Sequence, residues 1–138
     1  MDWATFWSAA SAIATTAAAL IAVWAMFRWR KQEELKVKLS FKLAIASYSY
    51  QLTQMPEMLV GPALRSEQTN NAKKLSELLS ACNNAWFACE GLLDDNKEVK
   101  SCWEYIFENN KKYLNGEIDS KNLGASCMGI VHKKFVFD

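Results

Sequence analysis

Residues that could carry catalysis are scarce in this chain and stand apart from one another. His132 is the single histidine among the 138 residues, so Ser–His or Cys–His catalysis would depend on one residue near the C-terminus. No P-loop, G-x-G-x-x-G, G-x-S-x-G or H-E-x-x-H motif occurs. We therefore interpret His132 as a solvated side chain, and we expect neither enzymatic activity nor a cofactor.

Two pairs of adjacent carboxylates are the other groups with potential for acid–base chemistry. They are Glu33-Glu34 and Asp94-Asp95. General acid–base catalysis needs a carboxylate whose pKa is tuned by its surroundings. Neither pair belongs to a motif that would supply such surroundings. We interpret the first pair as part of a solvated helix face and the second as a turn or helix cap.

The four cysteines do not have the spacing of a metal site. Cys82, Cys89, Cys102 and Cys127 form no C-x-x-C pair, and His132 alone could complete a zinc site. Two disulfides are possible in principle, but in a reducing cytoplasm the four should be free thiols. The first three recur on apolar helix faces, where small core residues are expected.

The most distinctive segment is a block of 25 residues, 3–27, that contains no charged residue, no Gly and no Pro. As a helix it would be about 37 Å long, whereas a bilayer core is about 30 Å thick. The alternative is a buried core helix of a soluble protein, but the roughly 100 residues that remain could scarcely surround a helix that is apolar on all sides. The sequence therefore predicts one membrane span. Aromatic residues near its two ends match the aromatic belts of membrane helices: Trp3, Trp7, Trp24, Phe27 and Trp29.

Basic residues follow the apolar block and none precedes it. A cleaved signal peptide would carry its basic residues ahead of the apolar core. The positive-inside rule instead places the N-terminus outside and residues 28–138 in the cytoplasm, with a bacterial inner membrane as the expected location. We expect Arg28, Arg30 and Lys31 to act as a stop-transfer cluster that contacts lipid headgroups.

Small residues recur along the span at alternating spacings of four and three. Such a seam lets two helix backbones approach closely inside a bilayer, so it predicts self-association or pairing with another membrane subunit. Because Ala, Ser and Thr fill 15 of the 25 positions, composition alone could also produce the pattern. The absence of ionisable residues from the span argues against a proton relay. The seam consists of Ala4, Ser8, Ser11, Thr15, Ala18, Ala22 and Ala25.

Residues 28–55 allow two interpretations. Apolar and polar residues alternate over 35–45, as in a strand, but most residues here are good helix formers. We favour a helix that continues from the span and carries apolar residues on two sides, which suits the centre of a bundle or a partner-binding role. One apolar stripe would hold Leu35, Leu39 and Leu43, and the other Phe41, Ile45, Tyr48 and Leu52.

Further along, Pro56 and Gly61-Pro62 break the chain, and the polar residues 66–71 predict a loop. Apolar residues at spacings of three and four then predict a helix from residue 72, ended by Gly91 and residues 94–96. Asp95 or Asn96 would cap the next helix, which Asn115-Gly116 would stop. Asp119 would cap a last, weaker helix.

The helices over residues 72–114 are joined by a short connection, so they should lie antiparallel. Trp86 and Trp103 would meet in their core. The apolar tail residues Phe135, Val136 and Phe137 would pack on the bundle or lie along an extended partner. The predicted core residues are Leu75, Leu79, Cys82, Trp86, Cys89, Cys102, Trp103 and Ile106.

The predicted fold is mainly α, with a membrane anchor at residues 1–31 and a small cytoplasmic helical hairpin or bundle at 32–138. Together with the juxtamembrane run RWRKQEELKVK, this layout resembles small bacterial single-pass membrane proteins. They include membrane effector components of anti-phage defence systems such as retrons. The resemblance implies a cytoplasmic sensor or docking part coupled to a membrane part that perturbs the inner membrane. It covers the chain in outline and assigns no role to any residue.

Three functions fit these features. The first is a membrane-anchored interaction module that oligomerises through its span and docks a cytoplasmic protein. The second is a toxin-like effector whose assembled spans breach the membrane, and the third is an accessory subunit of a larger membrane complex. Expected partners are membrane lipid, a second copy or another membrane protein, and a cytoplasmic protein. Nucleic acid is not expected, because the net charge is +1 and the basic residues are few.

Overall fold

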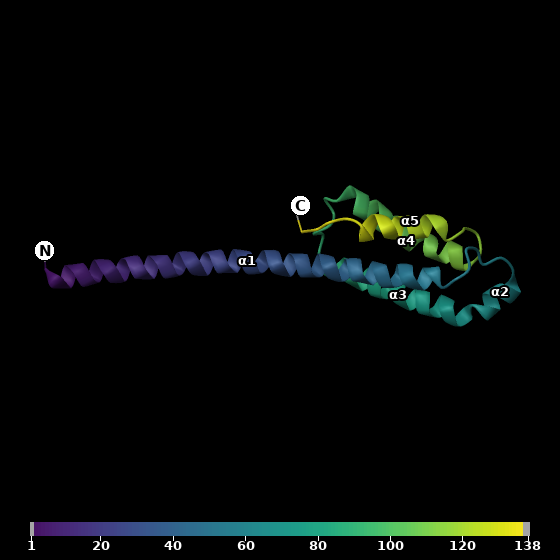
Figure 1. The fold of residues 1–138 in the computed structure, drawn as a ribbon, viewed down its shortest axis with the longest axis horizontal. Helices are drawn as coiled ribbons and strands as arrows, with labels where there is room; N and C mark the ends of the chain where they lie inside the picture. Colours follow the sequence, from purple (N-terminus) through teal and green to yellow (C-terminus); the bar gives the residue numbers. More distant parts are fainter. Residues whose placement is uncertain (1, 137–138) are drawn as a thin grey trace. The chain divides into compact units, whose positions relative to one another are not determined.

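The computed structural model describes residues 2–136 and is 79% helical, with no β-strand in that range. Its helices are α1 (Trp3–Thr53), α2 (Pro62–Glu67), α3 (Thr69–Ala88), α4 (Lys97–Leu114) and α5 (Lys121–Val131) (Figure 1). The predicted helix over residues 28–55 is confirmed as part of α1, and the alternative strand over 35–45 is wrong. The chain divides into two compact units, Met1–Glu34 and Leu35–Asp138.

The first unit contains the apolar part of α1 and the charged residues that follow it as far as Glu34. Its Ala-rich sequence without Gly or Pro favours an unbroken helix. Among the described residues of this unit, Ala10 is partly buried and all others are exposed. The hydroxyls of Thr15 and Thr16 donate to the carbonyls of Ser11 and Ala12, each over 2.9 Å. By length and composition, α1 is the one helix in the described chain that could cross a membrane, and no residue of its most apolar 18-residue window is buried.

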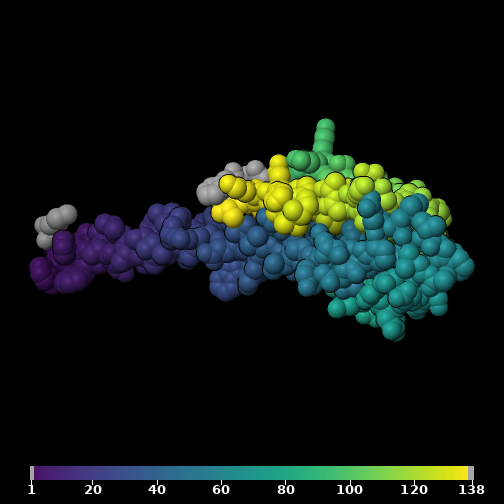
Figure 2. All heavy atoms as spheres, turned by 45° about the vertical axis from the view of Figure 1, so that its right-hand side comes forward, coloured from purple at the N-terminus to yellow at the C-terminus, as the bar shows by residue number. Residues whose placement is uncertain are grey.

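The second unit is built around residues 35–53 of α1. Phe41, Ile45, Tyr48 and Leu52 are spaced by four, three and four residues, so they form one stripe, and all four are buried. This stretch of α1 lies between α3 on one side and the α4–α5 pair on the other (Figures 1 and 2). The antiparallel directions predicted for α3 and α4 are present (Figure 1), and α1 packs against both helices through Phe41.

Aromatic rings from three helices meet in the core. The ring of Phe41 lies 5.3 Å from that of Trp86 and 5.6 Å from that of Trp103, measured between centroids. Trp86 and Trp103 are 6.1 Å apart, as their predicted meeting requires, and Phe107 lies 5.7 Å from Trp103. Contacts at these distances stabilise a core beyond simple burial. Phe41 of α1 thus joins α3 to α4, a contact that a two-helix hairpin would lack.

The hydroxyl groups of two tyrosines donate hydrogen bonds inside the second unit. Tyr48 donates to Oδ1 of Asn110 over 2.7 Å, and Tyr113 donates to the carbonyl of Pro56 over 2.6 Å. Burial raises the pKa of Tyr113 to about 12 and raises that of Tyr48 further still. Both phenols therefore remain neutral donors at any physiological pH, and they tie α1 and the segment after it to α4.

The predicted loop over residues 66–71 is wrong. These polar residues end α2, a helix that was not predicted, and begin α3. Pro62 occupies the start of α2, where its fixed φ suits a first helical turn. The Thr69 hydroxyl donates to the carbonyl of Ser66 over 2.8 Å, so a polar side chain here supports the helical joint.

α3 ends earlier than predicted. It stops at Ala88 because Glu90 and Gly91 have left-handed backbones, with φ of 47° and 83°. Leu92 and Leu93, expected on the helix, lie in the turns that follow. Leu93 is nevertheless buried, so its apolar character reflects the core rather than the helix.

The predicted caps of the two last helices are partly confirmed. Oδ1 of Asn96 accepts the N–H of Val99 at the start of α4, over 3.2 Å. Before α5 the boundary residue is Ser120, which makes no side-chain cap. Oδ1 of Asp119 instead accepts the N–H of Lys121 over 3.1 Å, so the predicted carboxylate still satisfies the first turn.

Gly116, which follows the C-cap residue Asn115 of α4, adopts φ of 76°, and a Cβ there would collide with the backbone carbonyl of Leu59. We expect Gly116→Ala to destabilise the second unit by about 1–3 kcal/mol, since both the strained φ and the close approach oppose a side chain. Gly124→Ala is the matched control, because a Cβ on this helical glycine meets no atom within 4 Å. Chemical denaturation followed by circular dichroism measures both. Equal midpoints for the two variants would contradict this role of Gly116.

The tail packs in part as predicted. Phe135 is buried, and the ammonium group of Lys42 lies 5.8 Å from its ring centroid. The same ammonium group donates to the carbonyl of Lys133 over 2.9 Å. Val136 is exposed, and Phe137 lies outside the described residues. The described tail therefore closes one side of the second unit.

Candidate functional site

The predicted small-residue seam is fully accessible in the first unit. Since residues three and four apart share a helix face, its members line one side of α1. Every one of them is exposed within this unit. They are Ala4, Ser8, Ser11, Thr15, Ala18, Ala22 and Ala25.

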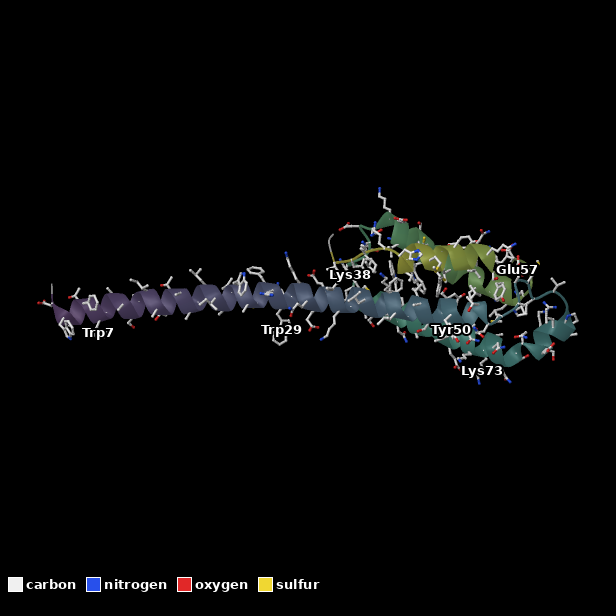
Figure 3. The ribbon with its side chains drawn as sticks, in the orientation of Figure 1. Trp7, Trp29, Lys38, Tyr50, Glu57 and Lys73 are labelled. Atoms are coloured by element: carbon white, nitrogen blue, oxygen red, sulfur yellow. The ribbon has the colours of Figure 1, made fainter. Side chains whose placement is uncertain are left out.

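Large apolar side chains on this unit are also exposed. Ile13, Leu20 and Trp24 are 70%, 66% and 62% exposed. In the first two turns, Trp3, Phe6 and Trp7 cluster with ring centroids about 6 Å apart, and the side chain of Trp7 stands out from the helix in Figure 3. A helix with this much exposed apolar surface needs a non-aqueous neighbour.

The three predicted headgroup-contacting residues follow the apolar block as an exposed cluster. Arg28, Arg30 and Lys31 are all exposed. The guanidinium of Arg28 lies 5.4 Å from the ring centroid of Trp24, a cation–π distance. Together the Trp and the Arg present an apolar ring and a charge at one level of the helix, as residues at a membrane boundary do.

The predicted core residues of the second unit fall into two groups. Five are buried: Leu75, Cys82, Cys89, Trp103 and Ile106. Leu79, Trp86 and Cys102 are partly buried and pack against the core. Sequence reasoning omitted Phe41 and Tyr48 from this set, although it placed both on an apolar stripe of the preceding helix.

The four cysteines are free thiols. Burial raises the pKa of the Cys82 and Cys127 thiols from 9.0 to about 12, and it also raises those of Cys89 and Cys102. Nucleophilic attack requires the thiolate, so burial lowers the reactivity of these thiols. No group of three His, Cys, Asp or Glu side chains within residues 2–136 is arranged as a metal site.

This burial predicts how the thiols react with a maleimide at pH 7.5. A pKa of about 12 in place of 9.0 lowers the thiolate fraction of Cys82 and Cys127 about a thousandfold. We expect mass spectrometry to find both unlabelled in the native chain under conditions that label all four in denaturant. The folded state keeps these protons while the unfolded chain loses them above about pH 9, so stability should fall as the pH rises from 9 towards 12. Rapid native labelling of both would contradict their placement.

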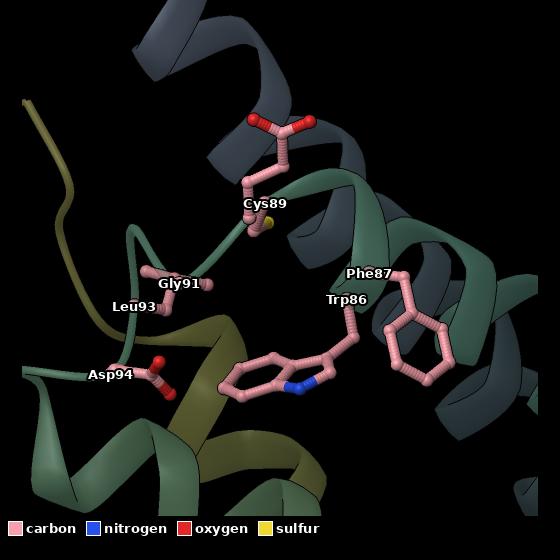
Figure 4. A pocket seen from close by; sticks show the side chains of 7 residues that line it. Trp86, Phe87, Cys89, Gly91, Leu93 and Asp94 are labelled. Carbon is pink, nitrogen blue, oxygen red and sulfur yellow. The ribbon is translucent and has the colours of Figure 1, made fainter.

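A small pocket of about 220 Å³ follows the end of α3 (Figure 4). Its wall includes Trp86, Cys89 and Asp94. The thiol of Cys89 donates to the Ala85 carbonyl over 3.3 Å, and Asp94 pairs with Lys100 over 3.2 Å. The Cys89 thiol and the Asp94 carboxylate are therefore already engaged, and Glu90, which is exposed, also lines this pocket.

A larger hollow of about 620 Å³ lies beside the tail. It is lined by Lys38, Lys97 and Lys133 together with Asp95 and Glu98. The ammonium of Lys133 lies 3.7 Å from a carboxylate oxygen of Glu98. Because charges of both signs face this space, it has no clear preference for an anion or a cation.

A third hollow, of about 430 Å³, is a groove between α1 and α3. Its apolar lining includes Leu43, Ala46 and Leu78, and Tyr50 and Lys74 lie at its sides. Leu43 and Tyr50 are 68% and 69% exposed. Sequence reasoning placed Leu43 on a stripe with Leu35 and Leu39 but gave no sign that Leu35 would pack against the core while Leu39 and Leu43 stay exposed.

No protein-family model, curated protein or solved structure matches the chain. A function therefore has to be inferred from its own residues and their geometry.

Proposed function

We propose that this chain is a single-pass, membrane-anchored interaction module. Residues 3–27 would cross the membrane, and the second unit would lie in the cytoplasm and bind protein partners. One observation carries the proposal: 25 consecutive residues without a charge form a helix in which no side chain is buried. Such a surface is unstable in water and ordinary in lipid.

The polar groups of the apolar helix also suit a bilayer. In lipid every backbone polar group has to be satisfied within the segment, and a helix does this. The hydroxyls of Thr15 and Thr16 donate to carbonyls one turn earlier, so they expose no unsatisfied donor. The Trp24–Arg28 pair supports a membrane boundary near residue 28.

The orientation follows from charge and is supported by the thiols. Arg28, Arg30 and Lys31 favour the cytoplasmic side, because translocating basic residues is disfavoured. Four free cysteines in the second unit suit a reducing compartment. Both features support a cytoplasmic second unit and an N-terminus on the opposite side.

The seam gives the anchor a second role. Helices in lipid associate through close packing of small residues, and the seam residues are all available for it. The second unit adds a helical scaffold whose four thiols are free and whose core tyrosines Tyr48 and Tyr113 are hydrogen-bonded. This combination supports binding and tethering, and we assign partner docking to the second unit.

Membrane fractionation tests this function. We expect the full chain to remain in the membrane pellet after washing with alkaline carbonate and to be released by detergent. A deletion of residues 3–27 should be recovered in the soluble fraction with its helical circular dichroism retained. Recovery of the full chain as a soluble monomer would contradict the proposal, and loss of membrane potential on expression would favour the membrane-perturbing alternative over tethering.

A further inference from the structure

The second unit leaves one apolar stripe of α1 uncovered. We name Leu39, Leu43, Ala46 and Tyr50 the outer stripe. Leu39 is 38% exposed, Leu43 68% and Tyr50 69%, while Ala46 is partly buried. The stripe that includes Phe41 lies on the other side of the same helix and is buried in the core. A folded helix that keeps large apolar residues in solvent on one whole side presents a candidate interface.

The outer stripe borders a groove that a side chain can enter. The groove of about 430 Å³ runs along Leu43, Ala46 and Tyr50 and is closed on its far side by Leu78 and Lys74 of α3. Tyr50, one of the lining residues, is labelled on α1 in Figure 3. A second helix laid along the stripe would therefore meet both α1 and α3.

The spacing of the outer stripe continues that of the seam. Counting on from Ala25 in the same alternation of four and three gives positions 29, 32, 36, 39, 43, 46 and 50. The last four positions are the outer stripe. α1 is α-helical from Trp3 to Thr53, and a repeat of seven residues held over several heptads is the pattern of a left-handed coiled coil.

We infer that the outer stripe packs against the outer stripe of a second copy of this chain, in a parallel pair. The inference rests on the proposed function, because membrane insertion is what gives two copies the same direction. In a parallel pair, equivalent heptad positions of the two helices face each other. Seam would then meet seam in lipid, and outer stripe would meet outer stripe in the cytoplasm.

Anchoring explains how so short a stripe can suffice. Two copies held by the same membrane meet at a raised effective concentration, so the second contact needs little additional area. The contact is also self-complementary, as a two-fold symmetric interface must be. Each Leu43 would face Leu43 of the other copy, and Leu78 would add apolar surface from α3.

Three positions between the seam and the outer stripe are not small or aliphatic. They hold Trp29, Gln32 and Lys36, and all three are exposed. Polar residues at core positions weaken a coiled coil, and Lys36 would face Lys36 of the other copy. We therefore expect these positions to contribute no attraction and to separate a pairing segment in lipid from one in the cytoplasm.

Cysteine crosslinking in membranes carrying the full chain tests the inference. Leu43→Cys and Tyr50→Cys are placed on the outer stripe, and Ser101→Cys is the matched control at an exposed site on α4. A disulfide requires Cα atoms within about 7 Å, so copper phenanthroline should give dimers of the two stripe variants at least about tenfold faster than dimers of the control. The unmodified chain, whose own thiols are buried or partly buried, should give none.

A variant within the span separates this inference from the proposed function. Ser8→Cys reports seam pairing in lipid. If Ser8→Cys crosslinks and the stripe variants do not, the outer stripe is not an interface between copies, and the inference is overturned while the proposed function stands. Crosslinks only to a different protein, or equal rates for Ser101→Cys, overturn it as well. A chain that is not in the membrane fraction overturns both.

A charge on the stripe provides an independent check of the same contact. Leu43→Glu introduces like charges face to face in a pair, whereas Ser101→Glu adds the same charge elsewhere on the surface. We expect Leu43→Glu to reduce Tyr50→Cys crosslinking at least about tenfold, with Ser101→Glu leaving it unchanged. Unchanged circular dichroism would show that each variant is folded, and undiminished crosslinking in Leu43→Glu would overturn the inference.

Discussion

Trp103→Ala is expected to remove about 3–5 kcal/mol from the free energy of unfolding of the second unit, which is a large part of what a unit of this size has. Trp103 is 4% exposed. Its ring contacts those of Phe41, Trp86 and Phe107, so truncation would leave a cavity between α1, α3 and α4. Denaturant titration in detergent, followed by far-ultraviolet circular dichroism, measures the loss.

Trp29→Ala is the matched control for this prediction. It makes the same truncation at a residue that is 69% exposed and outside the second unit. Its effect on the unfolding midpoint should stay within about 0.5 kcal/mol. If Trp103→Ala and Trp29→Ala have the same unfolding midpoint, the three-helix aromatic core does not stabilise the unit.

Ala14→Arg is expected to abolish membrane integration. An arginine at the centre of a span costs about 2.5–3.5 kcal/mol on the scale of insertion experiments, which is about a hundredfold or more in the insertion equilibrium. The many alanines of this span are only weakly apolar, so little surplus remains to offset the charge. Carbonate extraction after expression should find this variant displaced from the membrane pellet.

An arginine placed beyond the span serves as the control, because it adds the same net charge without putting a charge in the lipid. Gln32→Arg adds an arginine next to Arg30 and Lys31, where the positive-inside rule favours it. This variant should stay in the membrane pellet like the unmodified chain. Equal extraction of Ala14→Arg and Gln32→Arg would mean that residue 14 does not lie in lipid.

Much of the fold could be predicted because its local signals agree. The 3–4 spacing of apolar residues identified α3 and α4, and the cap at Asn96 and the stop at Gly116 marked the ends of α4. The absence of Gly and Pro before Pro56 predicted that α1 would run on past the apolar block. In each case the determinants lie within a few residues of the feature they specify.

The errors and the open alternative arose where distant contacts or backbone geometry decide the outcome. For residues 35–45 the favoured helix is correct, and a strand remained the alternative because α1 needs apolar residues both for its core side and for its outer side. The end of α3 depends on the left-handed backbone of Glu90, a residue that rarely adopts it. The helical joint at residues 66–71 depends on hydrogen bonds of polar side chains that composition alone assigns to a loop.

One part of the candidate site could be predicted from the sequence and another part could not. The seam is a property of one helix, so spacing alone could predict it. Which of the two apolar stripes of α1 would stay uncovered could not be predicted, because that depends on where α3, α4 and α5 pack. Phe41 and Leu43 are two residues apart and chemically alike, yet one is buried and the other is 68% exposed.

Thiol labelling of spheroplasts with a membrane-impermeant maleimide tests most directly whether α1 crosses the membrane with its N-terminus outside. Asp2→Cys places a thiol ahead of the apolar block, and Ser101→Cys places one on the surface of the second unit. The proposed topology predicts that Asp2→Cys is labelled in intact spheroplasts and that Ser101→Cys is labelled only after the membrane is permeabilised. Labelling of Ser101→Cys from outside, or protection of Asp2→Cys until permeabilisation, would contradict it.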